Sequence, residues 1–114
     1  MDLDRADFEA LVDQALDEIP DEIASQVNNV VVLVEDEPPY DEPDLLGVYV
    51  GVSLTERTHD HSGLPDRITI FRRPLLELCD TPSELVRQVR ITVVHEIAHH
   101  FGMDDERLHD LGYG

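Results

Sequence analysis

The chain has 114 residues, a length that fits a single compact domain over residues 1–114 and excludes a two-domain enzyme. It carries 26 acidic residues against 8 basic ones, which gives a formal net charge of −18. This charge argues against nucleic acid and anionic membranes as partners, because binding to either depends on basic side chains. The single cysteine, Cys79, excludes an intramolecular disulfide. There is no apolar run of membrane-spanning length and no basic N-terminal leader, so we expect a cytoplasmic protein.

The N-terminal residues 4–18 are expected to form an amphipathic helix. Its apolar side chains recur at steps of three and four residues: Phe8, Leu11, Val12, Ala15, Leu16 and Ile19. Asp4 or Asp7 is placed to cap the first turn, and Pro20 ends the helix because proline cannot continue it. A short helical turn is expected from Asp21.

Three strands are expected in the middle of the chain. Residues 30–34 are a continuous β-branched and aliphatic run, which favours a buried strand. Residues 35–44 hold six acidic residues and three prolines, so they are expected to form a solvated loop; calcium binding is the weaker alternative, because the spacing matches no EF-hand. Residues 45–54 predict a second strand, weakened at Gly47 and Gly51, and residues 68–71 a third. The loop between these two contains His59 and His61.

A long helix is expected from Pro82 to about Phe101. Thr81 is its predicted cap, Pro82 takes the first helical position, and Glu84 completes a capping box. Gly102 permits a left-handed exit. The second half of this helix is apolar on almost every face, which indicates a central position in the fold. A helical turn at Pro74 is expected before it, and a short acidic helix over residues 104–111 after it.

The motif that carries chemistry is His95-Glu96-Ile97-Ala98-His99, an H-E-x-x-H pattern on the long helix. Residues at i and i+4 share a helix face, so both imidazoles can reach one metal ion. Glu96 lies about 100° further round the helix, where it can approach a metal-bound water without being a ligand. Neutral imidazole suits Zn²⁺, which lowers the pKa of bound water.

A third ligand is expected just after the helix. Gly102 allows the chain to turn back sharply, and Asp105 follows it by three residues. Two histidines and one carboxylate make an accepted open zinc site. His109 is the alternative third ligand, and His100 is assigned to the surface or to a supporting position.

The string His95-Glu96-x-x-His99-x-x-Gly102-x-x-Asp105 resembles the extended motif of metzincin-type metallopeptidases, with Asp where most of them have His. The short chain more closely resembles the minimal zincin family of small bacterial zinc metallopeptidases. Two further stretches, residues 46–49 and 54–57, also look like that family. The resemblance implies zinc ligands His95, His99 and Asp105, with Glu96 as general base. It also implies an α+β fold, in which a small twisted mixed sheet of three to four strands packs on the active-site helix and the N-terminal helix.

The function expected from this resemblance is hydrolysis of peptide bonds in a peptide or protein substrate by metal-activated water. The substrate is expected to lie along the edge of the strand at residues 47–52. Candidates for a transition-state donor are Arg107, His109 and Tyr113. The printed sequence stops nine residues after Asp105 (106–114), which leaves no room there for the methionine turn of metzincins.

Two other classes of function remain as alternatives. One is a non-catalytic, zinc-stabilised interaction module, which a fourth protein ligand such as His59 or His61 would favour. The other is a metal-dependent ribonuclease with ligands spaced H-x₃-H-x₅-H. Asp stands at the last ligand position here, and the net charge of −18 opposes RNA binding.

Overall fold

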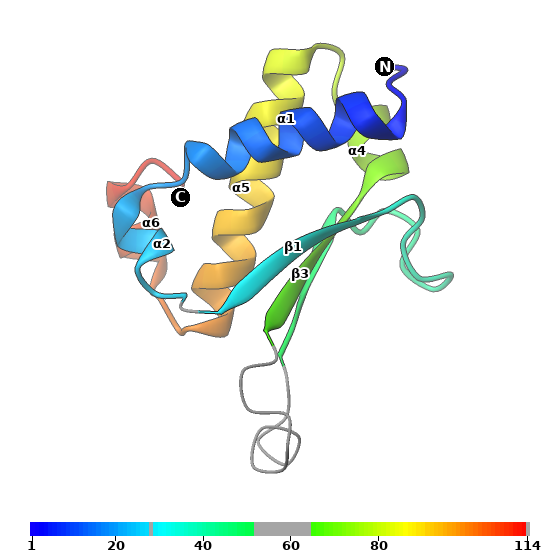
Figure 1. Ribbon diagram of the computed structural model, residues 1–114. Helices are drawn as coiled ribbons and strands as arrows, with labels where there is room; N and C mark the ends of the chain where they lie inside the picture. The colour runs from blue at the N-terminus through cyan, green and yellow to red at the C-terminus, as the bar shows by residue number, and fades with distance from the viewer. Residues whose placement is uncertain (28, 52–64, 114) are drawn as a thin grey trace.

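The computed structural model describes residues 1–27, 29–51 and 65–113 (Figure 1). In chain order its elements are α1 (Arg5–Asp17), α2 (Asp21–Ala24), β1 (Val30–Glu35), β2 (Gly47–Val50), β3 (Asp66–Phe71), α4 (Arg72–Leu78), α5 (Pro82–His100) and α6 (Asp105–Asp110). The helices and strands predicted from the sequence are therefore present, and the residues after Gly51 in the predicted second strand lie outside the described part of the chain. No helix in the described part is long and apolar enough to cross a membrane.

The strands form one mixed sheet in the order β1-β3-β2. β1 runs parallel to β3, with Val30 opposite Asp66, and β2 runs antiparallel to β3, with Tyr49 opposite Ile68. Helices cover one face of this sheet, as Figure 1 shows. This is the α+β architecture that the sequence predicts: a small mixed sheet of three strands packed against a central helix and an N-terminal helix.

The strand predicted at residues 30–34 is confirmed as β1, but the expectation that it is buried is met by only some of its residues. β1 is an edge strand, and its side chains alternate between the covered and the open face of the sheet. Val34 is buried, whereas Val31 and Leu33 are 41% and 44% exposed. A continuous apolar run indicates burial on both faces only when helices pack on both faces, and here they pack on one.

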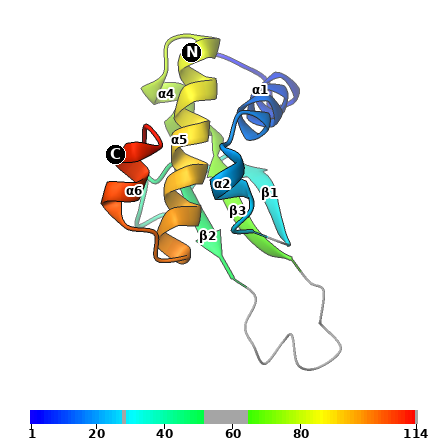
Figure 2. The ribbon, with the colours of Figure 1, turned by 90° about the vertical axis from the view of Figure 1, so that its left-hand side faces the viewer.

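The core lies between the sheet and the pair α1 and α5. Phe8, Val12 and Ala15 are the buried residues of α1, and they belong to the face predicted from the apolar spacing. α5 buries residues along its whole length: Leu85, Val86, Val89, Val93, Val94, Ile97 and Ala98. Figure 2 shows α5 crossing in front of β2, with α1 and α2 on one side of it and α6 on the other. The expected central position of this helix is confirmed.

Local signals fix where α5 begins. Thr81 Oγ1 accepts a hydrogen bond from the Glu84 N–H at 3.1 Å, as a helix cap should. Glu84 reaches back as well, but its Oε2 accepts from the N–H of Asp80 at 2.8 Å rather than from that of Thr81. The bond to Thr81 satisfies a donor that the first turn of a helix leaves unpaired, and the bond from Asp80 ties the residue before the cap to the same turn. Cys79, which precedes this cap, is buried as expected of a small apolar side chain.

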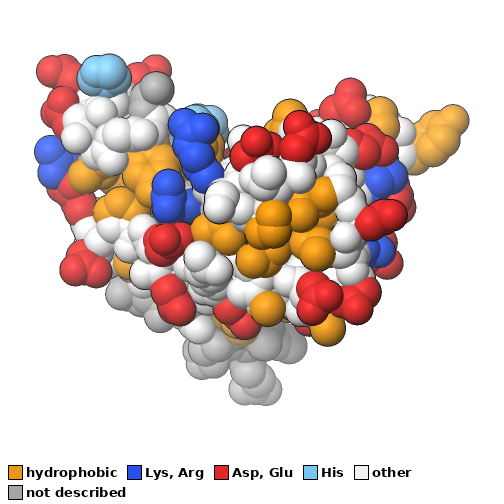
Figure 3. Space-filling view, turned by 90° about the horizontal axis from the view of Figure 1, so that it is seen from above, with side chains coloured by type: hydrophobic (Ala, Val, Ile, Leu, Met, Phe, Trp, Pro, Cys, Tyr) orange, Lys and Arg blue, Asp and Glu red, His pale blue; other side chains and the backbone are white. Residues whose placement is uncertain are grey.

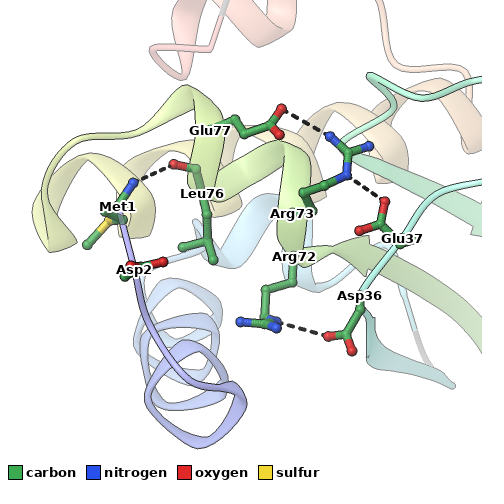
Figure 4. Close-up of a pocket in the computed structure, with 8 residues that line it drawn as sticks. All are labelled: Met1, Asp2, Asp36, Glu37, Arg72, Arg73, Leu76 and Glu77. Carbon is green, nitrogen blue, oxygen red and sulfur yellow. Dashed lines mark hydrogen bonds and ion pairs between the residues drawn. The ribbon is translucent and has the colours of Figure 1, made fainter.

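Arginines fasten the acidic segment after β1 to the helix α4. Arg72 Nε donates to Asp36 at 2.9 Å, and Arg73 pairs with both Glu37 at 2.5 Å and Glu77 at 3.0 Å. Figure 4 shows these side chains around a hollow that also includes Met1 and Leu76. The carboxylates of Asp36, Glu37 and Glu77 are already paired with guanidinium groups, so this hollow is a structural junction.

Candidate metal centre

His95 and His99 lie one turn apart on α5 and face the same cleft. Their ring centroids are 6.1 Å apart. His95 is half-buried and His99 is exposed, so the pair is accessible from solvent. The cleft has a volume of about 450 Å³, and the other residues lining it come from α6 and the segment after it: Asp105, Glu106, Leu108, His109 and Tyr113. The structure thus brings the two motif histidines together with both candidates for the third ligand.

The turn at Gly102 places α6 beside these histidines. Gly102 has φ +70°, a left-handed conformation that favours glycine. The next residue, Met103, donates its N–H to the carbonyl of Ala98 at 2.9 Å, which closes the end of α5. Asp104 then caps α6 by accepting the N–H of Arg107 at 2.7 Å. Asp104 is therefore occupied as a cap, and its neighbour Asp105 lines the cleft together with Glu106.

His95 has a partner at the far end of the chain. Its Nε2 lies 2.7 Å from the main-chain carbonyl oxygen of Tyr113. This contact holds the segment after α6 against one side of the cleft. Sequence reasoning named Tyr113 as a candidate donor through its side chain, whereas the group that meets His95 is its carbonyl.

Glu96 lies on the adjacent face of α5 and contacts the sheet. Its Oε1 accepts a hydrogen bond from the main-chain N–H of Tyr49 in β2, at 3.2 Å. β2 is at the edge of the sheet, as expected of the strand proposed to hold substrate. The carboxylate of the predicted base therefore touches the strand edge. Sequence reasoning did not find this contact, although residues 46–49 stood out by resemblance.

Tyr49 also holds the end of α5 in place. Its ring stacks on that of His100, with centroids 3.9 Å apart, and Phe101 packs edge-on against both rings. The Tyr49 hydroxyl donates to Asp66 Oδ2 at 2.7 Å, across to β3. His100 is exposed and faces β2, in agreement with the supporting position assigned to it. This cluster fixes the last turn of the helix, immediately after His99.

A single residue without a side chain lets β2 approach α5 so closely. A Cβ atom on Gly47 would lie 2.9 Å from Thr92 Cγ2 and 3.1 Å from the carbonyl oxygen of Thr69. Both distances are shorter than ordinary van der Waals contacts, so a side chain at this position would force the strand and the helix apart. Gly47 therefore maintains the spacing on which the bond between Tyr49 and Glu96 depends.

The side chains around the cleft supply the donors that zinc takes. Imidazole nitrogens from His95, His99 and His109 and a carboxylate from Asp105 are typical zinc ligands. Among the described residues, no three such groups are already arranged to hold one ion. The donor set therefore fits zinc in chemistry, and ligation requires side-chain adjustment, including at His95 Nε2. His59 and His61, considered as a fourth ligand, lie outside the described residues.

Comparison with known proteins places this chain in a family. The family model of zincin-like metallopeptidases matches residues 27–114, which includes the whole sheet, α5 and α6. A solved structure of a conserved hypothetical protein from T. thermophilus has a similar fold, with a TM-score of 0.60 at 22% sequence identity; the match covers 87% of this chain and 94% of that one. The comparison with curated proteins found no match. The chain belongs to the zincin-like metallopeptidase family.

Proposed function

We propose that this protein is a zinc-dependent peptidase in which His95, His99 and Asp105 hold the metal and Glu96 is the general base. The observation that carries the proposal is the arrangement around the end of α5. Two histidines of one helix face share a cleft with Asp105, and the glutamate between them contacts the edge of the sheet. The assignment of residues 1–114 to a single zincin-like domain is part of the same proposal.

The chemistry divides between the metal and the residues of this chain. Bound zinc would polarise the scissile carbonyl and lower the pKa of its water. The Glu96 carboxylate would take the proton from the attacking water and pass it to the leaving nitrogen. Its bond to the Tyr49 N–H holds it in one orientation before substrate arrives, which is the preorganisation a general base needs.

The edge of β2 is the proposed seat of the substrate. The N–H of Phe71 donates to the carbonyl of Leu46 at 3.0 Å, so residues 46, 48 and 50 direct their main-chain groups toward β3. Gly47 and Tyr49 therefore direct theirs to the outer edge, where Glu96 is. The Tyr49 N–H on this edge is already bonded to Glu96, so an extended peptide would pair beside it, at Gly47, and place its backbone next to the base.

Glu96→Gln is the decisive variant. Gln retains an oxygen that can accept the Tyr49 N–H but cannot take a proton. We expect it to bind zinc as the parent does, by metal analysis, and to cleave a mixed peptide library roughly 10²- to 10⁴-fold more slowly, the usual contribution of a general base. Cleavage at the parent's rate would refute the role of Glu96.

His95→Ala tests the metal site, and His100→Ala is its matched control, because both residues are histidines of the same helix. His95→Ala should lose zinc, whereas His100→Ala should retain it. Full zinc stoichiometry in His95→Ala would refute the site. If the parent binds zinc but cleaves no peptide, the non-catalytic zinc module takes precedence. Cleavage of RNA by the zinc-loaded parent would instead favour the ribonuclease.

A further inference from the structure

The sheet has a second outer edge, on β1, remote from the metal cleft. The carbonyl of Asn29 accepts the N–H of Asp66 at 2.9 Å, with Val30 opposite Asp66 in the parallel register. Because bonding residues alternate along a parallel ladder, residues 31, 33 and 35 direct their main-chain groups toward β3. The N–H and C=O groups of Val30, Val32 and Val34 therefore point away from the sheet, toward α1.

A groove of about 420 Å³ runs between this edge and α1. Apolar side chains line its interior: Val12 and Leu16 from α1, and Val32 from β1. The exposed acidic residues of its lining form its acidic rim, in which Glu9 is already paired with Arg5: Glu9, Asp13 and Glu35. Arg5 ends the groove, because its guanidinium donates to the Val34 carbonyl and pairs with Glu9. That bond is independent evidence that the Val34 carbonyl faces outward.

We propose that this groove binds an extended, basic segment of a partner protein, which adds to β1 as a fourth strand. Unpaired main-chain groups at a sheet edge bind extended chain, because the added strand completes the ladder. The apolar interior accepts every second side chain of such a segment, and the acidic rim attracts Lys or Arg at the positions between.

Charge selects this occupant over a second copy of the chain. Pairing two β1 edges would bring together two acidic rims on molecules that each carry a net charge of −18. Figure 3 shows acidic side chains spread around the apolar patches of one face of the molecule, where they outnumber the basic ones. A cationic partner gains from this field at long range as well as in the groove.

A direct test uses an alternating lysine–valine octapeptide, with a glutamate–valine octapeptide of the same length as the charge control. Binding would be followed by amide NMR and by calorimetry at low salt. We expect the lysine peptide to bind and to shift the amide signals of Val30 and Val32. Its binding should weaken with added salt. The glutamate peptide should not bind. Equal binding of the two peptides, or binding that leaves the β1 amide signals in place, would overturn the proposal.

Two variants probe the two parts of the groove. Val32→Pro removes an N–H that faces the groove and that the ladder with β3 does not use, so the strand should be retained. It should weaken binding of the lysine peptide about three- to tenfold, which is the usual contribution of one hydrogen bond. Asp13→Lys changes only an exposed side chain on α1, and should weaken binding by a similar factor that high salt removes.

Asp41→Lys is the matched control for Asp13→Lys, because it makes the same change in net charge at an exposed loop position outside the groove. It should bind the lysine peptide with at least half the parent's affinity. If Asp41→Lys weakens binding as much as Asp13→Lys does, the attraction is general and the groove is not the site. A concentration-dependent dimer that shifts the β1 amides would show that a second copy is the occupant, against our proposal.

Discussion

The main-chain N–H of Tyr49 donates a hydrogen bond to Glu96 Oε1 across 3.2 Å, so the edge strand of the sheet is joined directly to the helix that carries the H-E-x-x-H motif. The same tyrosine stacks on His100 and donates its hydroxyl to Asp66. One residue therefore connects β2, β3 and the last turn of α5. The position of the proposed base is thus set by the sheet as well as by its helix.

Removal of the hydrogen bond between Tyr49 and Glu96 should lower the stability of the protein. Two different substitutions of Glu96 separate this effect from the effect on catalysis. Glu96→Leu leaves the Tyr49 N–H without its acceptor and should lower the free energy of unfolding by about 1–3 kcal/mol. Glu96→Gln retains an acceptor and should stay within about 0.5 kcal/mol of the parent. Urea unfolding followed by circular dichroism measures both. Equal stability of the two variants would mean that the bond contributes nothing.

Gly47→Ala should destabilise the protein by about 1–3 kcal/mol, because the added Cβ overlaps Thr92 Cγ2 and the Thr69 carbonyl. Gly51→Ala is the matched control, since the nearest atom to its added Cβ is His100 Cε1 at 3.5 Å, an ordinary contact. Thermal unfolding of the two variants makes the comparison. The double variant Gly47→Ala with Thr92→Ala should recover part of the loss. An unaffected Gly47→Ala would show that the spacing between β2 and α5 is not tight.

The third ligand can be identified by comparing Asp105→Ala with His109→Ala, because both side chains line the cleft. We expect Asp105→Ala to weaken zinc binding by more than the roughly 10- to 100-fold that loss of an outer-shell partner costs. His109→Ala should stay within that range. Competition with a zinc chelator gives both affinities. The reverse order would assign His109 as the ligand.

Asp36 should make the fold sensitive to acid. The hydrogen bond from Arg72 holds the pKa of the Asp36 carboxyl below its usual 3.8, assisted by the charges of Arg72 and Arg5. A carboxyl whose pKa is lower in the folded state than in the unfolded state stabilises the fold at pH values above its unfolded-state pKa. This stabilisation is lost as the pH falls through the folded-state pKa. The free energy of unfolding of Asp36→Asn should therefore approach that of the parent below about pH 4.

Asp41→Asn, an exposed carboxylate outside the arginine pairs, is the control for Asp36→Asn. Urea midpoints of parent and variants at neutral pH and at about pH 3 supply the comparison. A stability difference between Asp36→Asn and the parent that is the same at both pH values would contradict the assignment.

Local signals in the sequence predicted the helices well. Thr81, Pro82 and Gly102 specify α5 through groups within one turn of each end. Thr81 makes the expected cap bond, Pro82 lies in the first turn, and Gly102 has the expected left-handed conformation. The pairing of His95 with His99 is equally local, since it follows from helix geometry. Such features need no knowledge of the rest of the fold.

Features that depend on distant residues were not predictable in the same way. Val31 and Leu33 are exposed because no helix covers their face of the sheet, which the run of valines alone does not reveal. The contacts of Glu96 with Tyr49 and of His95 with Tyr113 join residues 47 and 18 positions apart. They follow from the strand order and from the path after Gly102, and neither has a signature in the residues themselves.

The weak anchorage of α6 has a consequence for how the protein responds to metal. Leu108 is its one buried side chain, and an ion pair between Arg107 and Glu22 is its main polar tie to the rest of the molecule. If zinc joins α5 to Asp105, occupancy of the site adds to the stability of this segment as the logarithm of metal concentration. Amide hydrogens of α6 would then exchange early without zinc and late with it, so that local unfolding of the C-terminal segment reports the metal available to the protein.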